Sequence, residues 1–473
     1  MCGIVGIVDA GGVSIQLYYA LYALQHRGQE SAGISTFDGT LLHKFKGSGL
    51  VADVFSPSVL SDLKGMVGIG HVRYPTTGSN LPENIQPLNF QFQDHFISIA
   101  HNGNLVNTGE LRSEYESAGQ IFTTTTDTEV IAKILIDAIS NAGSVEDAVS
   151  RCMHKLVGSY AVTILIDGVI YGFRDPLGIK PFCIGKTEHG YMLASESVAI
   201  DALSAKFLRD VKPGELIRID ADGVRCMQIA VAGKRAHCIF EYIYFARADS
   251  IIDGVLVYDV RRTIGRKLFE EDPVKADSVC SVPDSGTAYA IGYAEGSKIP
   301  FVESLMKNRY MGRTFIMPTQ KERERAVRIK LNPIPGHLKD KSVVLVDDSI
   351  VRGTTSKRII EMMRDAGARE IHMRIGSPAI KAPCYLGVDM PTRGELIASN
   401  KNEDEVRKCI TSNTLHHISL DALTAAIGFD RESLCTGCLT GCYPLPIEGE
   451  KAKTCQISFV DETVQSKLGA FEA

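Results

Sequence analysis

The residue with the clearest chemical potential is Cys2, which directly follows Met1. Removing Met1 would leave a free α-amine and a thiol on one residue. An α-amine has a pKa of about 7.7–8.0, so it can accept the thiol proton near neutral pH and act as a general base. A Met-Cys start also fits a small buried thiol at the beginning of a strand, so other residues must decide between the two interpretations.

Three polar segments elsewhere in the first half of the chain favour the catalytic interpretation of Cys2. Arg73 ends one apolar run, where its guanidinium can bind a carboxylate through two hydrogen bonds. Asn102 and Gly103 follow another, and an Asn amide beside a Gly N–H can form an oxyanion hole. Asp127 stands at a predicted helix start, where it is either an ordinary first-turn acid or a partner for a substrate ammonium.

These segments resemble class-II glutamine amidotransferase domains. The shared stretches, in chain order, are CGIVG at 2–6, QHRGQESAG at 25–33, HVRY at 71–74, HNGN at 101–104 and TDTE at 126–129. The resemblance implies that Cys2 attacks the side-chain amide of glutamine and releases ammonia. It also implies that Arg73 and Asp127 hold the glutamine carboxylate and amino group, and that Asn102 and Gly103 stabilise the oxyanion.

The elements that must position these residues are short strands and two helices. Strand-like runs cover residues 3–8, 67–72, 96–100, 161–166 and 217–219, and helical patterns cover 15–25 and 127–141. This pattern predicts a layered α+β domain. The resemblance implies that this domain, residues 1–230, has an N-terminal-nucleophile fold, which is an αββα sandwich.

A second chemical signature follows a buried strand in the other half of the chain. The Val-rich run 341–346 leads into two acids, a Gly/Ser/Thr loop and a helix predicted over 356–366. Loop N–H groups and hydroxyls at a helix N-terminus bind phosphate, and the acids can reach ribose hydroxyls or Mg²⁺. A further strand at 370–375 completes a βαβ unit, which predicts an α/β domain with a parallel sheet over 231–473, including a cysteine-bearing tail.

This segment resembles the phosphoribosyl pyrophosphate (PRPP) loop of type-I phosphoribosyltransferases. The stretch 307–330 adds eight basic residues against two acids, which suits a lid that gathers anions. The resemblance implies one Mg²⁺ per subunit at Ser285, Asp347 and Asp348. It further implies a PRPP site made of Asp347, Asp348, Ser349, Arg352, Gly353, Thr354, Thr355, Asp284, Ser285, Gly286, Lys307, Tyr310 and Arg313.

Taken together, the halves resemble amidotransferases that pass the nitrogen of glutamine to PRPP. Residues 241–247 and 307–315 carry further signatures, and Ala248 departs from the usual Pro. The resemblance implies a pentosyltransferase that converts glutamine, PRPP and water into 5-phosphoribosylamine, pyrophosphate and glutamate, committing PRPP to purine synthesis. It also implies feedback by purine nucleotides and a homodimer or homotetramer.

Cysteines provide a third candidate site. Cys435 and Cys438 form a C-x-x-C pair, which alone fits a zinc half-site, a redox pair or two inert thiols. Some relatives carry a [4Fe–4S] cluster, whose usual ligands are cysteine thiolates. The resemblance implies one cluster per subunit at Cys238, Cys384, Cys435 and Cys438, with Cys442 open as a substitute ligand.

Composition limits the remaining classes. The 473 residues are 44% hydrophobic and 23% charged, as in soluble globular proteins, and the formal charge of −5 disfavours coating nucleic acid. We expect a cytoplasmic protein without membrane spans or a secretory signal. Two alternatives are a catalytically inactive PRPP-binding regulator, disfavoured by the complete Cys2 set, and an amidotransferase that makes an amino sugar phosphate, disfavoured by the acidic PRPP loop.

Overall fold

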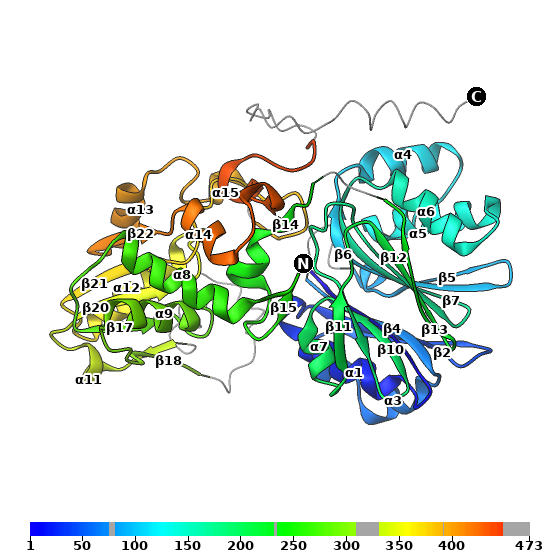
Figure 1. Cartoon of the computed structure of the whole chain (residues 1–473), viewed down its shortest axis with the longest axis horizontal. Helices are drawn as coiled ribbons and strands as arrows, with labels where there is room; N and C mark the ends of the chain where they lie inside the picture. Colours follow the sequence, from blue (N-terminus) through cyan, green and yellow to red (C-terminus); the bar gives the residue numbers. More distant parts are fainter. Residues whose placement is uncertain (75–80, 231–233, 309–330, 391, 448–473) are drawn as a thin grey trace.

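The computed structural model describes residues 1–74, 81–230, 234–308, 331–390 and 392–447. These residues form two lobes, and the amino terminus lies between them (Figure 1). Met1 is fully buried and packs in the hydrophobic core of the second lobe. No described helix is long and apolar enough to span a membrane.

The first lobe contains two antiparallel sheets. In spatial order, the seven-stranded sheet consists of β11 (Lys206–Asp210), β9 (Cys183–Lys186), β10 (Gly190–Ala194), β1 (Gly3–Asp9), β4 (Val67–Arg73), β2 (Ser31–Phe37) and β3 (Leu42–Ser48). The six-stranded sheet consists of β13 (Gly223–Gln228), β12 (Glu215–Asp220), β8 (Val169–Arg174), β7 (Gly158–Ile166), β6 (His95–Leu105) and β5 (Leu88–Phe92).

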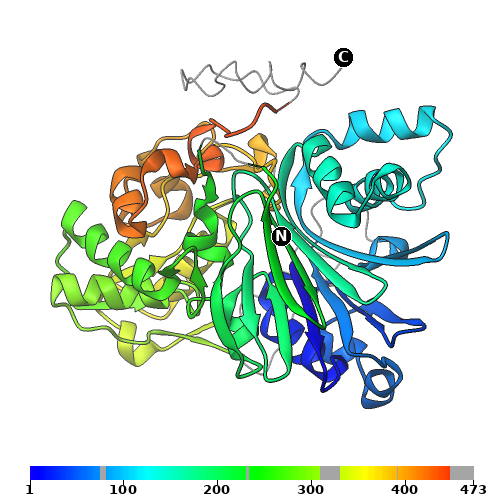
Figure 2. The same ribbon diagram turned by 45° about the vertical axis from the view of Figure 1, so that its right-hand side comes forward.

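Helices cover the outer faces of these two sheets. The seven-stranded sheet is covered by α1 (Ser14–Ala23), with α2 (Val51–Val54), α3 (Pro57–Asp62) and α7 (Ser197–Asp201) nearby. The six-stranded sheet is covered by α5 (Asp127–Asn141) and α6 (Val145–Lys155), beside α4 (Thr108–Ser117). Figure 2 shows the cyan helices outside their sheet. A third core lies between the sheets, which confirms the predicted αββα sandwich.

The second lobe is built on a parallel sheet. Its order is β17 (Ser278–Ser281), β20 (Ser342–Asp347), β21 (Glu370–Ile375) and β22 (Thr414–His417). Side chains alternate along β20: Val344 and Val346 pack with α8 (Val257–Glu271) and α9 (Thr287–Ser297), whereas Val343 and Leu345 pack with α12 (Thr354–Asp365). Helices therefore cover both faces, as predicted for an α/β domain.

Short elements complete the second lobe. They are β14 (His237–Cys238), the π-helix η3 (Glu241–Phe245), β15 (Ile251–Ile252), β16 (Val255–Leu256), β18 (Leu305–Lys307), β19 (Leu331–Pro333), α11 (Pro335–Leu338), η4 (Arg393–Glu395), α13 (Glu403–Ile410), α14 (Leu420–Ile427), η5 (Arg431–Ser433), β23 (Leu434–Cys435) and α15 (Gly437–Thr440). β14 pairs in parallel with β23, so the start of this lobe is bound to its end.

Two predicted helices differ in their bounds from the structure. The helix expected over 15–25 ends at Ala23, and a separate 3₁₀ turn, η1, covers Gln25–Arg27. The helix expected from Ser356 begins at Thr354, directly after Gly353, whose φ of 76° provides the sharp turn out of the loop. Its start therefore lies closer to the acids at the end of β20.

Candidate active site

Cys2 precedes β1 and lies beside the end of β4, because Gly3 pairs with Val72. Its side chain is only 7% exposed. The backbone N–H of Cys2 donates to Asn102 Oδ1 (3.0 Å), the thiol donates to the Tyr74 carbonyl (3.6 Å), and the Cys2 carbonyl accepts from Arg27 Nε (2.9 Å). Cys2 is therefore fixed by three hydrogen bonds.

Asn102 and Gly103 lie within β6, opposite Ala161 and Tyr160 of β7. Asn102 is fully buried, and its Nδ2 has no acceptor among the described residues although its Oδ1 is bonded to Cys2. A buried donor without a partner is costly unless a ligand supplies the acceptor. A Cβ at position 103 would lie 2.0 Å from the Ser159 carbonyl oxygen, so only glycine fits there.

Arg73 and Asp127, the predicted glutamine-binding residues, are both buried. Asp127 begins α5, and its Oδ2 accepts from the Leu105 N–H (3.1 Å) while Oδ1 lies 3.4 Å from His101 Nδ1. Burial acts to raise the pKa of Asp127, but His101 and the backbone N–H bonds outweigh it and bring the pKa below its ordinary value. Asp127 is therefore an anion at neutral pH.

A buried ion cluster behind Cys2 was not predicted from the sequence. Arg27 of η1 bonds Glu196, and it makes a bidentate pair with Glu241 of η3 (2.6 and 3.0 Å). The charges of these two carboxylates outweigh burial and raise the pKa of Arg27 above its ordinary value. This cluster joins Cys2 to the second lobe, and only the fold brings its three members together.

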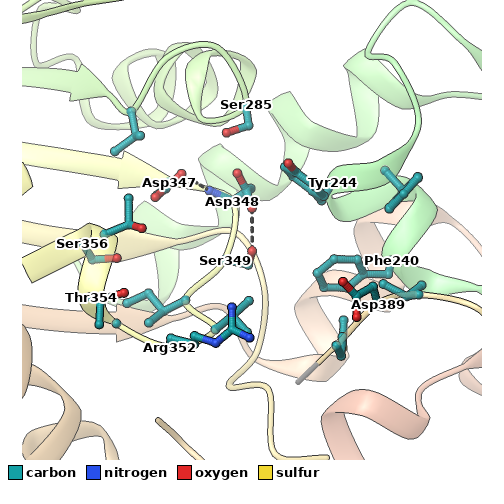
Figure 3. Close-up of a pocket in the computed structure, with 18 of the residues that line it drawn as sticks. Phe240, Tyr244, Ser285, Asp347, Asp348, Ser349, Arg352, Thr354, Ser356 and Asp389 are labelled. Carbon is teal, nitrogen blue, oxygen red and sulfur yellow. Dashed lines mark hydrogen bonds between the residues drawn. The ribbon is translucent and has the colours of Figure 1, made fainter. Parts of the chain in front are cut away.

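The predicted PRPP loop lines a cavity of about 380 Å³ (Figure 3). Most predicted contacts lie there: Ser285, Asp347, Asp348, Ser349, Arg352, Gly353, Thr354 and Thr355. Phe240 and Tyr244 face the loop from the other side. Tyr74, whose carbonyl accepts from Cys2, also lines this cavity, so the two candidate sites are neighbours.

The two acids at the end of β20 are buried next to each other. The Asp348 N–H donates to Asp347 Oδ1 (2.9 Å), and the Ser349 hydroxyl donates to Asp348 Oδ1 (2.6 Å). Burial and then the charge of Asp348 raise the pKa of Asp347 well above its ordinary value. Two buried carboxylates with a nearby Ser hydroxyl, that of Ser285, form a donor set suited to Mg²⁺.

The remaining predicted PRPP residues lie apart from this cavity or outside the described part. Asp284 and Lys307 form an ion pair and line an adjoining cavity of about 520 Å³. Gly286 lines neither of the two cavities; a Cβ there would lie 2.5 Å from the Val346 carbonyl oxygen. Tyr310, Arg313 and most of the predicted basic lid fall outside the described residues.

The four predicted cluster cysteines are brought together by the fold. Cys238 pairs with Cys435 across β14 and β23, and the Cys438 carbonyl accepts from the Lys381 and Ala382 N–H groups, just before Cys384. Cys384 Sγ accepts from the Leu386 and Val388 N–H groups (both 3.4 Å). All four are free thiols, whereas Cys442 is disulfide-bonded.

The thiols interact strongly enough to affect one another's protonation. Burial raises the pKa of Cys438 well above its ordinary value, and the charges of Cys384, Cys238 and Cys435 add to that rise. Within the described ranges, no group of three or more His, Cys, Asp or Glu side chains is placed so that it could hold a metal ion. Four cysteine thiols are nevertheless the type of donor that a [4Fe–4S] cluster uses.

The fold and site define a class-II glutamine amidotransferase joined to a phosphoribosyltransferase. A family model described as a glutamine amidotransferase domain matches residues 71–202. The chain is 51% identical to the amidophosphoribosyltransferase of Methanothermobacter thermautotrophicus, covering 95% of both chains, and 50% identical to that of Archaeoglobus fulgidus, covering 96% of this chain and all of the relative. The chain therefore belongs to the amidophosphoribosyltransferase family.

A solved structure agrees over the full fold. The PRPP amidotransferase of Bacillus subtilis, solved in complex with ADP and GMP, matches 95% of this chain and 98% of its own with a TM-score of 0.89 and 43% identity. The reaction of this family transfers the amide nitrogen of glutamine to PRPP and belongs to purine biosynthesis. The sequence-based interpretation of fold and enzyme class is confirmed.

Proposed function

We propose that Cys2, after removal of Met1, is the nucleophile of the glutamine half-reaction. Its α-amine takes the thiol proton, and the thiolate adds to the side-chain amide carbon of glutamine. The developing oxyanion accepts hydrogen bonds from Asn102 Nδ2 and the Gly103 N–H. Ammonia leaves, and water then hydrolyses the thioester to glutamate. The observation that carries this assignment is the buried, unpartnered Asn102 Nδ2 beside Cys2.

The substrate-holding residues follow from charge. Arg73 would bind the glutamine carboxylate and Asp127 its ammonium, which suits the anionic state of the Asp127 side chain. Ammonia would then pass Tyr74, which contacts Cys2 and lines the PRPP cavity, and attack C1 of the ribose. The bond from C1 to the pyrophosphate oxygen breaks as the new C–N bond forms, and the amine loses a proton.

In the PRPP cavity, the loop from Ser349 to Thr355 would hold the 5-phosphate through its N–H groups and hydroxyls. Asp347, Asp348 and Ser285 would hold one Mg²⁺, which supplies charge stabilisation for the leaving pyrophosphate when bound. Asp284, Gly286 and Lys307 would contact the pyrophosphate. Tyr310 and Arg313, which lie outside the described residues, are proposed PRPP contacts on the family resemblance alone.

We further propose a [4Fe–4S] cluster at Cys238, Cys384, Cys435 and Cys438. The convergence of four free thiols, two of them buried (Cys238 and Cys438) and two partly buried (Cys384 and Cys435), supports it. Anaerobically purified enzyme should contain about four iron and four sulfide per chain and absorb near 400 nm, as such clusters do. Absence of iron, sulfide and this absorbance would contradict the cluster.

The remaining proposals concern organisation. We place the domain boundary near residue 230, between β13 and β14, where the sandwich ends and the second core begins. A homodimer or homotetramer, a cytoplasmic location and inhibition by purine nucleotides are inferred by analogy with the family. The Bacillus subtilis structure with ADP and GMP supports the nucleotide proposal.

The test of the overall reaction is product release under anaerobic conditions. Glutamine and PRPP are added singly and together, and glutamate and pyrophosphate are measured. We expect equal amounts of both products with both substrates present. Glutamate released without pyrophosphate would show that PRPP is not the acceptor.

Replacing the nucleophile should separate the half-reactions. Cys2→Ser should abolish glutamine-dependent synthesis but leave synthesis from added ammonia near the wild-type rate, because the PRPP cavity is untouched. Cys226→Ser, at an exposed cysteine, is the matched control and should leave both activities unchanged. Loss of both activities in folded Cys2→Ser would contradict separate sites.

A further inference from the structure

Lys180 is a fully buried lysine that the proposed mechanism does not use. It lies between β8 and β9, and its backbone is fixed by a bond to Asp175 Oδ2 (3.2 Å) and one from Arg174 Nε (2.6 Å). Its Nζ has no hydrogen-bond partner among the described residues. A buried ammonium without an acceptor is costly, so its position calls for a nearby anion.

The backbone around Lys180 leads to the cysteine site. The carbonyl of the preceding residue, Ile179, accepts from the Cys238 N–H (3.2 Å). A Cβ built on Gly387 would lie 3.0 Å from Lys180 Nζ, and the N–H groups on either side of Gly387 donate to Cys384 Sγ. Lys180 Nζ is therefore close to the loop that holds one of the four thiols.

Nearby carboxylates are already engaged elsewhere. Asp175 accepts backbone N–H groups from Tyr160, Leu177, Ile179 and Lys180. Glu241 is paired with Arg27 through both of its oxygens. The proposed cluster, one of whose ligands is Cys384 beside Gly387, would supply the anion that Lys180 lacks among the described residues.

We propose that Lys180 is the internal counter-charge of the four-cysteine site. Its ammonium offsets the negative charge that four thiolates bring to a [4Fe–4S] cluster and thereby helps to retain the cluster and to set its reduction potential. The inference rests on the proposed cluster. Lys180 would act as a positioning residue, through the charge that it presents to the cluster.

The test compares two neutral variants, Lys180→Met and Lys180→Gln, with the charge-retaining Lys180→Arg. Lys186→Met, on the exposed face of β9, is the matched control. Each full-length enzyme is purified anaerobically. Iron and sulfide per chain, the midpoint potential of the cluster and the thermal unfolding midpoint are measured. The midpoint potential separates the two explanations. If the charge of Lys180 matters, Lys180→Arg keeps the wild-type potential and the neutral variants do not; a purely structural role predicts no such dependence on charge.

We expect Lys180→Met and Lys180→Gln to lose a large part of their iron and sulfide, or to show a more negative midpoint potential, because reduction adds negative charge. Lys180→Arg and Lys186→Met should stay near the wild-type values. Neutral variants with wild-type iron, sulfide and potential would overturn the role of Lys180 alone. If the neutral variants do not fold, the Lys180→Arg variant decides. A midpoint potential of Lys180→Arg that differs from the wild-type value would also overturn the counter-charge role of Lys180. Wild-type enzyme without iron and sulfide would overturn the cluster, and the inference with it.

Discussion

At the scale of single residues, the two amide atoms of Asn102 stand in different situations. Its Oδ1 fixes the Cys2 nitrogen, and its Nδ2 is free for a ligand within the described part of the chain. The sequence motif indicated Asn102 and Gly103 as a pair. It did not show why position 103 excludes a side chain, because the limiting contact comes from Ser159 on the neighbouring strand.

Asn102→Asp should separate these two roles. The substitution keeps an oxygen acceptor for the Cys2 nitrogen but replaces the oxyanion donor with a negatively charged oxygen. Removal of one such donor costs about 10²–10³ in kcat, so glutamine hydrolysis should fall at least that far. Synthesis from ammonia should remain. Steady-state assays with each nitrogen source measure both, and an equal loss with ammonia would contradict the assignment.

The Asp347 carboxyl provides a pH-dependent prediction. Its raised folded pKa means that the folded protein retains a proton that the unfolded chain has already released, so the magnesium-free protein loses stability as the pH rises through that pKa. Mg²⁺ competes with the proton, so the stabilisation by Mg²⁺ should grow with pH. Thermal unfolding with and without Mg²⁺ at several pH values measures this.

Asp347→Asn is the control for that experiment, since an amide does not titrate. Its unfolding midpoint should depend less on pH, and its response to Mg²⁺ should be much weaker than that of the wild type. A magnesium effect that is the same in both proteins would show that the ion binds elsewhere.

At the scale of secondary-structure elements, η1, α7 and η3 meet through buried charge. Arg27 comes from η1, Glu196 directly precedes α7, and Glu241 begins η3, whose Tyr244 and Phe245 line the PRPP cavity. The Arg27 guanidinium also lies over the Phe245 ring, 5.3 Å from its centroid. The cluster therefore fixes a wall of the PRPP cavity relative to Cys2.

Arg27→Met should be strongly destabilising, because it leaves Glu241 buried without its cation. Breaking a buried pair in this way costs about 3–5 kcal/mol. The double variant Arg27→Met/Glu241→Gln removes the stranded charge and should recover part of that loss. Urea unfolding measures both free energies, and a double variant no more stable than Arg27→Met would contradict the pairing.

The elements themselves were largely predictable from sequence. Apolar residues at positions 130, 131, 134, 135 and 138 indicate a helix with one buried face, and α5 has those bounds. The run before Asp347 is apolar on both faces, which indicates a covered parallel strand. The split between α1 and η1 was missed because the residues through Gln25 continue the helical pattern, and the break depends on Arg27 reaching two carboxylates elsewhere in the fold.

At the scale of the whole molecule, the two halves could each be predicted, but the contact between them could not. Motifs identify each half because its chemistry lies in short contiguous segments. Tyr74, Glu241 and Lys180 each lie beside residues of the other lobe, and spacing along the chain carries no sign of these contacts. The burial of Met1 between the lobes belongs to the same class of feature.

The pairing of β14 with β23 has a consequence for biosynthesis. Cys238 is made early in the second half and Cys435 close to its end, yet the two stand side by side. The ribosome must therefore have synthesised the chain through β23 before β14 and β23 can pair. Until then, β14 of the nascent second lobe lacks its partner strand β23, and Cys238 lacks its neighbour Cys435. The proposed cluster, which needs both cysteines, could therefore form only after Cys435 has been translated.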